Sequence, residues 1–380
     1  MDLDSVESVR PICRKIFGYV QEDRSCYFSL DLTKLEEVAA LVKKVSSERY
    51  SSGKVPYHSR LRHFPPDLLS PILSPDPSIQ GSRLFDLVTV SVLLDAGAGS
   101  EWKFRAPKRL DSATGSSGDS EYTNYTRSEG LGAASLVMFL NGNFSSDPSD
   151  NFRVDAEKLK KLSINELSDG LQVTPSNPML GLEGRWQLLR SLGSRLEELG
   201  LTRPSDLLKL LSSHQKVEDN STFSIRQIWD VLFPALSPLW PKKDVWYHST
   251  LGPVCFHKLF QWLLYSYVEV LELHYGWTVL DKELQTGLPE YRNGGLFVDL
   301  GVLNLRQPQT DPWPVSSDAV IEWRACTVVL LDLLKDGWFP EMPLCCMLEG
   351  GTWVAGRRAA SQKRPNGDSP ILLILDGTVF

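Results

Sequence analysis

Three acidic side chains stand in segments where an ionised carboxylate is costly unless it has a partner. Glu290 lies in LPEYRNGG, Asp299 lies between apolar residues in LFVDLGVLN, and Glu322 lies within the apolar stretch VIEWRAC. Burying an unpaired charge is expensive, so these acids are expected either to form ion pairs or to serve a functional site. The candidate partners are the nearby arginines Arg292, Arg306 and Arg324. For any one acid alone, a structural ion pair is the better interpretation.

The densest group of cationic side chains lies in YHSRLRHF, where His58, Arg60, Arg62 and His63 follow one another closely between prolines. Arginine presents a planar fork of donors that suits phosphate, and histidine can donate a hydrogen bond or a proton. The pattern therefore predicts an anion-binding segment. The alternative is a solvated loop with ordinary surface charges.

The glycine-rich segment DAGAG at 95–99 follows the apolar run VTVSVLL. In class I methyltransferases such a loop lets the backbone approach an adenosyl cofactor. The chain continues with EWKFRAPKRL rather than with alternating strands and helices, so a tight turn that ends a buried helix is the favoured interpretation. No HExxH or similar spacing indicates a metal site, and the adjacent Cys345 and Cys346 are typical of buried small residues. We expect neither a cofactor nor a metal.

Composition narrows the class of protein. The 380 residues are 42% apolar and 23% charged, as in a soluble globular protein. The net charge of −7 argues against a protein that binds nucleic acid through a basic surface covering the phosphates. No stretch approaches the roughly 18 apolar residues that a membrane span needs, and the start of the chain lacks the apolar core of a secretory signal. Six scattered cysteines form no disulfide framework. We expect a reduced, cytoplasmic protein that contacts no membrane.

Helical periodicity dominates the elements that must position these residues. Amphipathic or buried helices are predicted at 32–47, 127–142, 181–200, 205–211, 255–273 and 317–334, the last with Asp318 as its N-cap. The apolar segment 83–99 can be a helix or a strand, and 106–128 reads as a loop. Short strands are expected in the N-terminal half and in the tail ILLILDGTVF. The prediction is a mainly α fold in one extended domain, 1–380: an N-terminal part (1–105), a flexible loop (106–128), and a helical core that carries the site (129–380).

Several phrases along the chain resemble the uracil catabolism protein 4 family of fungi and bacteria. They are HSRLRHF, VSVLLDAGAGSEW, RSEGLGAASL, GLEGRWQLLRSLG, FHKLFQWLLYSY, PEYRNGGLFVDLGVL, VIEWRACTVVLL and the ending DGTVF. The resemblance covers most of the chain. It implies a role in a route that degrades uracil by way of its nucleotide and yields urea.

A more distant resemblance, to the queuosine salvage proteins, implies a mechanism. Those proteins have a helical fold like that of DNA glycosylases and hydrolyse the N-glycosidic bond of queuosine 5′-phosphate. Their Ala-Asp-Tyr-Arg segment and the Leu-Gly-x-Leu that follows it are similar to 289–292 and 300–303 here, and their Glu-x-Arg helix is similar to 322–324. The catalytic aspartate of that family corresponds to Glu290, so this chain keeps the carboxylate one methylene further out.

Together the two resemblances imply hydrolysis of a urea–ribose 5-phosphate to urea and ribose 5-phosphate. Glu290 would be the main carboxylate, with Asp299 as its competitor and Glu322 in a supporting role. Substrate binding would fall to Tyr291, Arg292, Arg324, Lys258, His58, Arg60, Arg62 and His63. The expected partner is a small nucleotide-like substrate, with association with other uracil-degrading enzymes and no nucleic acid. Two alternatives stay open: a non-catalytic partner of the ring-opening enzyme, and a DNA glycosylase.

Overall fold

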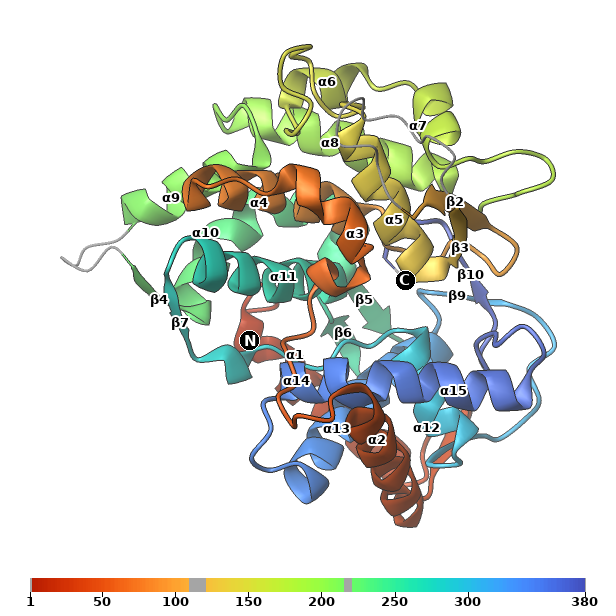
Figure 1. The fold of residues 1–380 in the computed structure, drawn as a ribbon. Coiled ribbons are helices and arrows are strands. Elements are labelled where there is room, and N and C mark those ends of the chain that lie inside the picture. The colour runs from red at the N-terminus through yellow and green to blue at the C-terminus, as the bar shows by residue number, and fades with distance from the viewer. Residues whose placement is uncertain (1, 109–120, 215–220, 380) are drawn as a thin grey trace.

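The protein is built mainly of helices, as the sequence predicted (Figure 1). The structure is a computed structural model and describes residues 2–108, 121–214 and 221–379. The α-helices are α1 (Val9–Gln21), α2 (Leu35–Arg49), α3 (Pro66–Leu69), α4 (Pro77–Leu93), α5 (Arg127–Leu140), α6 (Ala156–Lys161), α7 (Ile164–Gly170), α8 (Leu182–Glu198), α9 (Leu207–His214), α10 (Ile225–Leu236), α11 (Lys258–His274), α12 (Tyr291–Asp299), α13 (Asp318–Trp338), α14 (Leu344–Met347) and α15 (Trp353–Lys363).

The strands are short and pair two by two within the described residues. Antiparallel pairs are β1 (Phe28–Leu30) with β8 (Leu303–Leu305), β2 (Lys103–Pro107) with β3 (Tyr122–Thr126), and β5 (Val245–His248) with β6 (Gly252–Cys255). Parallel pairs are β4 (Thr222–Ser224) with β7 (Thr278–Leu280), and β9 (Trp313–Pro314) with β10 (Leu373–Ile374). These ladders tie distant loops together and leave the core to the helices.

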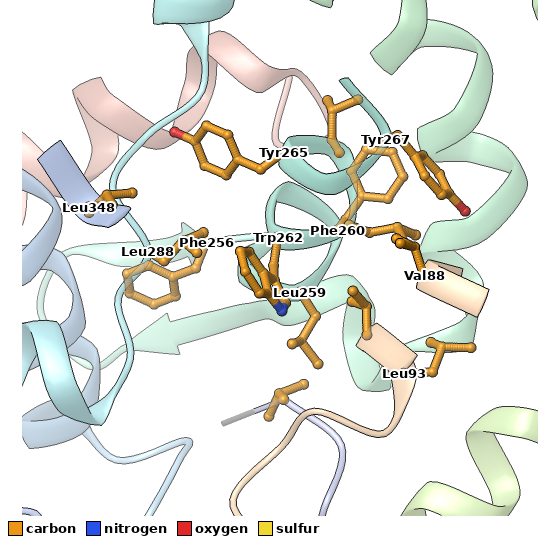
Figure 2. Close-up of a cluster of buried hydrophobic side chains, with 14 of the residues drawn as sticks. Val88, Leu93, Phe256, Leu259, Phe260, Trp262, Tyr265, Tyr267, Leu288 and Leu348 are labelled. Carbon is orange, nitrogen blue, oxygen red and sulfur yellow. The ribbon is translucent and has the colours of Figure 1, made fainter. Parts of the chain in front are cut away.

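The core is centred on α4, α11 and α13, which are apolar on nearly every side. The contact between α11 and α4 includes a stacked pair, Phe85 and Tyr267, with ring centroids 3.8 Å apart. In Figure 2, Val88 of α4 lies beside Phe260 and Tyr267 of α11. One continuous cluster of buried apolar residues runs from Val6 to Val379. Helices of this kind gain most of their stability from packing rather than from intrinsic propensity.

The segment 83–99, which could have been a helix or a strand, is helical up to Leu93, and DAGAG at 95–99 forms the turn that follows. This confirms the favoured interpretation of the glycine-rich segment. α4 ends at Leu93, and the buried guanidinium of Arg185 donates to the carbonyls of Leu94 (2.9 Å), Ala96 (2.6 Å) and Leu180 (2.5 Å). The bonds to Leu94 and Ala96 satisfy carbonyl groups that the end of α4 and the following turn leave without partners. An arginine from α8 thereby fixes the turn that presents Asp95.

Two local predictions differ from the structure. Ser317, not Asp318, caps α13, because its hydroxyl accepts from the amide of Val320; Asp318 instead accepts from the amide of Ser249 at 2.9 Å. The expected loop 106–128 begins with the last two residues of β2, contains the whole of its partner strand β3, and ends with the first two residues of α5. Alternating exposure along β2 suits a half-buried hairpin, whose short strands carry a weak sequence signal. The middle of that loop lies outside the described residues.

In the described part of the chain, no helix is both long enough and apolar enough to cross a bilayer. The six cysteines are free thiols, and all but Cys26 are buried. Within the described residues, no group of three or more His, Cys, Asp or Glu side chains could hold a metal ion.

Candidate active site

Segments from most of the chain meet around one cavity, which we call the Glu290 cavity. The atoms around it leave about 500 Å³ of space, a volume that includes the open solvent at its mouth. Its lining residues are His58, His63, Asp95, Ala96, Gly97, Ala98, Arg127, Ser128, Lys258, Trp262, Leu288, Glu290, Tyr291 and Trp353. The cavity thus combines two acids, two histidines, a lysine and an arginine with indole and phenol rings.

Glu290 is the N-cap of α12. Its Oε2 accepts from the amide of Arg292 at 2.8 Å, and its Oε1 accepts from the amide of Asn293 at 2.6 Å. Both donors belong to the first turn of a helix, where N–H groups lack intrahelical partners and negative charge is favoured. Only 8% of the residue is exposed. The backbone therefore fixes a carboxylate in the cavity wall.

Glycines allow α12 to pack closely enough to hold this carboxylate in place. A Cβ on Gly294 would come within 2.7 Å of the indole of Trp323 on α13. A Cβ on Gly356 of α15 would lie 2.1 Å from the carbonyl oxygen of Arg292. Real Cβ atoms do not approach so closely, so both helix contacts require glycine. The Asn-Gly-Gly sequence after Glu290 therefore serves close packing of the helix that carries it.

Aromatic rings form another part of the cavity wall. The imidazole of His63 stacks on the indole of Trp353, with centroids 4.7 Å apart and planes 18° apart. The indole of Trp262 lies 4.5 Å from the ring of His58. The guanidinium of Arg292 lies 3.9 Å from the Trp353 ring and 3.2 Å from Glu129, so it supports Trp353. These rings already pack on one another, so they form a rigid aromatic wall of the cavity.

Asp95 organises the floor of the cavity. Its carboxylate accepts from the indole N–H of Trp262 at 3.0 Å and from the hydroxyl of Ser128 at 2.8 Å, and it pairs with Arg60 at 2.9 Å. The Arg60 guanidinium is fully buried and also donates to the hydroxyl of Ser91. Arg60 and Asp95 neutralise one another, as buried ions must. The pair therefore presents no unbalanced charge to a ligand.

His63 is held in one tautomer by the same arginine. Its Nδ1 lies 3.0 Å from Nη1 of Arg60, and an arginine can only donate, so Nδ1 is the acceptor and the proton sits on Nε2. Burial, followed by the positive charge of Arg60, holds the pKa of His63 well below its usual value. Nε2 is buried and has no hydrogen-bond partner among the described residues. A neutral His63 therefore offers one N–H to whatever occupies the cavity.

Cationic groups complete the cavity. Lys258, the first residue of α11, is buried, and no hydrogen bond or ion pair of its ammonium occurs within the described residues. Burial lowers its pKa, although the charges of Glu290 and Asp95 oppose this shift. Arg127 begins α5 in the left-handed region (φ +56°) and pairs with Asp368 at 2.9 Å. The first turn of α5, with Ser128, also faces the cavity, and helix N-termini attract anions.

Of the residues singled out from the sequence, His58, His63, Lys258, Glu290 and Tyr291 line the cavity. Arg292 lies behind Trp353, and Arg60 lies behind Asp95. The others are engaged elsewhere. Asp299 pairs with Arg364 through two bonds of 2.7 and 2.5 Å, and Arg324 pairs with Asp244 at 2.7 and 2.8 Å. Glu322 contacts His248 at 3.2 Å and the hydroxyl of Ser25. Arg62 pairs with Glu269, and Arg306 contacts Asp23.

Several cavity residues carried too little signal in the sequence. Trp262 lies on the helix predicted at 255–273, whose aromatic residues read as core, whereas Trp353 begins α15, which the sequence did not predict. Arg127 and Ser128 fell where the expected loop 106–128 overlaps the expected helix 127–142, and neither residue was singled out. Asp95 stood in a segment that drew attention for its glycines rather than for its acid. A polar residue directly after a long apolar helix is the signal that could have identified it.

Comparison with known proteins covers nearly the full chain. The family model described as protein of unknown function (DUF1688) matches residues 2–380. The chain is 38% identical over 408 residues to Protein urg3 of Schizosaccharomyces pombe, covering 99% of this chain and 98% of that protein. It is 32% identical over 440 residues to Uracil catabolism protein 4 of Lachancea kluyveri, with the same coverage.

Proposed function

The chain belongs to the uracil catabolism protein 4 family, and on that premise we propose that it hydrolyses the N-ribosyl bond of a uracil-degradation intermediate. The name of the Lachancea kluyveri relative supports a role in uracil catabolism. We propose urea–ribose 5-phosphate as the substrate and urea and ribose 5-phosphate as the products. The observation that carries the proposal is the carboxylate of Glu290, fixed by two backbone amides inside a cavity that also holds a lysine with no partner among the described residues.

The reaction needs a fixed negative charge beside the sugar. Breaking the bond between C1′ and nitrogen builds positive charge on C1′ and the ring oxygen, which a carboxylate stabilises or traps. Glu290 fits this role because its two backbone hydrogen bonds set its position before the substrate arrives. Asp299, the competing acid, is occupied by Arg364 and does not line the cavity. We therefore propose Glu290 as the reacting carboxylate and assign Asp299 a structural role.

The phosphate of the substrate needs cationic groups that line the cavity. Arg60 and Arg62 have carboxylate partners and do not line it, whereas Lys258 lines it and has no partner among the residues that the structure describes. Arg127 also lines it, although it pairs with Asp368 at 2.9 Å. We propose that Lys258, Arg127 and the first turn of α5 hold the phosphate. Binding energy from this remote group can be used to hold the ribose against Glu290. The planar urea group would lie against the indole rings.

The position of Glu290 also bears on the two alternatives. A non-catalytic partner of the ring-opening enzyme has no need of a carboxylate shielded inside a cavity, and Glu290 is shielded. A DNA glycosylase is expected to carry a basic face, and the chain has a net charge of −7. Both considerations favour a small-molecule hydrolase.

The direct test is incubation of the purified protein with ribosylurea 5-phosphate and measurement of free urea. Glu290→Gln keeps the shape of the side chain but removes its charge, and we expect it to lower turnover by at least about 10³-fold. Asp155→Asn is a matched control. Asp155 is a buried helix N-cap whose carboxylate also accepts from two backbone amides, of Lys158 and Ser146, but it does not line the cavity. Turnover that survives in folded Glu290→Gln protein contradicts the proposed role.

A further inference from the structure

A second carboxylate lies directly behind the cavity and contacts one of its histidines. Oε2 of Glu349 is 2.9 Å from Nδ1 of His58, and both side chains are almost completely buried. The other oxygen, Oε1, accepts from the guanidinium of Arg49 and the hydroxyl of Tyr50, each at 2.9 Å. Glu349 therefore has donors on both oxygens and acts only as an acceptor toward the imidazole. The proton of His58 that faces it sits on Nδ1.

The backbone around Glu349 is irregular in a way that supports this contact. A π-helical turn, Leu348–Thr352, interrupts the helix between α14 and α15. Such turns are rare and occur often at functional sites. Gly350 and Gly351 in this turn lie against α2, where a Cβ on Gly351 would come within 2.4 Å of Val42. The turn and its two glycines bring Glu349 close to the end of α2, where Arg49 and Tyr50 hold it.

The other edge of the His58 ring is available to a ligand. His58 lines the Glu290 cavity, and no hydrogen bond of its Nε2 occurs among the residues that the structure describes. The ring is also fixed by the indole of Trp262, 4.5 Å away, and its backbone amide donates to the carbonyl of Cys345 at 3.1 Å. A carboxylate, an oriented imidazole and a free Nε2 in a cavity form the arrangement that enzymes use for proton transfer.

Two other cavity residues are poorer proton donors. His63 accepts from Arg60 through Nδ1 and carries its only proton on Nε2, so giving up that proton would leave an imidazolate. His63 is thus suited to donate a hydrogen bond but not to transfer a proton. The ammonium of Lys258 lies in the field of Glu290 and Asp95 and is needed there as a positive charge. His58 is the group left with both a free nitrogen and a supporting acid.

We propose that His58 is the proton donor to the leaving nitrogen and that Glu349 is the positioning residue that orients it. This inference rests on the proposed function. In the reacting form His58 is an imidazolium, with one proton on Nδ1 toward Glu349 and a second on Nε2 toward the cavity. As the bond between C1′ and nitrogen breaks, its electron pair stays on nitrogen, which takes the proton from Nε2 and leaves as neutral urea. His58 then keeps its proton on Nδ1, facing Glu349. Water adds to C1′ and gives one proton back to Nε2, so the ring is restored and the atoms balance.

The test compares two substrates that differ only in how much their leaving group needs an acid. Urea is a poor leaving group as an anion, whereas 4-nitrophenolate leaves readily without a proton. The proteins are wild type, His58→Gln, Glu349→Gln and Glu290→Gln, assayed on ribosylurea 5-phosphate and on 4-nitrophenyl ribofuranoside 5-phosphate. His274→Gln, a half-buried histidine outside the cavity, is the control and should behave as wild type on both substrates. Circular dichroism and thermal melting confirm that each variant is folded.

We expect His58→Gln to lose about 10²- to 10⁴-fold in urea release and less than about tenfold in nitrophenol release. Glu349→Gln should show the same selective loss to a smaller degree, because an amide oxygen still accepts from Nδ1 but carries no charge. Glu290→Gln should lose both activities. Equal losses on the two substrates in His58→Gln, or no loss of urea release, would overturn the role of His58 while leaving that of Glu290 intact.

Failure of the proposed function gives a different pattern. If folded wild-type protein releases neither urea nor nitrophenol, the N-ribosyl hydrolase assignment falls, and the role of His58 falls with it. If wild type releases nitrophenol alone, Glu290 keeps its role but urea is not the leaving group, and the proposed proton donor is overturned.

Discussion

The contact between Gly356 and the start of α12 gives the sharpest prediction about how the fold holds the site. Gly356→Ala adds a Cβ that would lie 2.1 Å from the carbonyl oxygen of Arg292, two residues beyond Glu290. Ordinary van der Waals contact begins near 3.4 Å, so the backbones of α15 and α12 must separate by about 1 Å. A movement of α12 displaces Glu290, and a movement of α15 displaces Trp353. Either movement changes the cavity.

The expected losses of stability and of turnover follow from the size of that displacement. Overpacking a well-packed contact costs about 1–3 kcal/mol in the free energy of unfolding. A displacement of about 1 Å in a catalytic group costs on the order of 10²-fold in rate. We therefore expect Gly356→Ala to be less stable by about 1–3 kcal/mol and to turn over substrate about 10²-fold more slowly, although it changes no side chain that lines the cavity.

The assay is denaturant unfolding together with urea release from ribosylurea 5-phosphate, measured under conditions where the variant is fully folded. Gly18→Ala is the matched control, because Gly18 lies in α1, where an added Cβ would meet no atom within 4 Å. Alanine at that position should stabilise the helix by about 0.5–1 kcal/mol. If Gly356→Ala is as stable and as active as wild type, the close approach of α15 does not set the position of Glu290.

Four further predictions follow from ion pairs, tautomers and backbone geometry. Asp299→Asn should lower the free energy of unfolding by about 1–3 kcal/mol through loss of its bonds to Arg364, with turnover per folded molecule within about twofold; a large loss of turnover at unchanged stability would make Asp299 the reacting carboxylate. Burial raises the pKa of Glu349, but the hydrogen bond from His58 and nearby cations outweigh it and hold that pKa at about 2, below the ordinary 4.5. The ionised form of Glu349 therefore stabilises the fold above about pH 4.5, and up to about 3 kcal/mol of the free energy of unfolding is lost as the pH falls toward 2. Glu349→Gln should show a shallower decline in the free energy of unfolding over that range. An equal decline in the variant and in wild type would contradict the ion pair. Arg127→Gly removes the guanidinium and places a residue that tolerates the positive φ at this position. KM should rise about 10- to 100-fold for ribosylurea 5-phosphate and stay constant for unphosphorylated ribosylurea. An equal rise in KM for both substrates would exclude a contact between Arg127 and the phosphate. The ring proton signals of His63 should not titrate between about pH 6 and 8 in NMR spectra, because its pKa lies well below that range.

Sequence periodicity was enough to predict six of the helices, because an apolar stripe at helical spacing must be buried wherever the helix packs. It did not predict α1, α10, α12 or α15, although α12 carries Glu290 at its N-terminus. The 317–334 segment, which is apolar on nearly every side, and the 255–273 segment became α13 and α11, at the centre of the core. Caps and short strands depended on weaker local preferences. Ser317 and Asp318 are both good N-caps, and which of them caps α13 depends on the contact that Asp318 makes with Ser249.

The sequence directed attention to Glu290, Lys258 and His58 but not to the partners that give them their chemistry. Asp95 neutralises Arg60, and Glu349 orients His58 across 291 positions of sequence. No local pattern encodes such pairings, since they depend on how α4, α5 and the π-helical turn approach one another. For the same reason the sequence could not tell that Asp299 has an arginine partner whereas Lys258 has none among the described residues.

The separation of His58 from Glu349 has a consequence for how the protein is made. During synthesis, the surface of α2 that receives the π-helical turn emerges from the ribosome about 300 residues before its partner. That surface stays uncovered in the growing chain, and long-range closures of this kind slow folding and leave apolar surface open to chaperones or to aggregation. Because the two halves of the proposed proton-transfer pair can meet only after residue 349 has been synthesised, the proposed activity should be a late marker of a correctly completed chain.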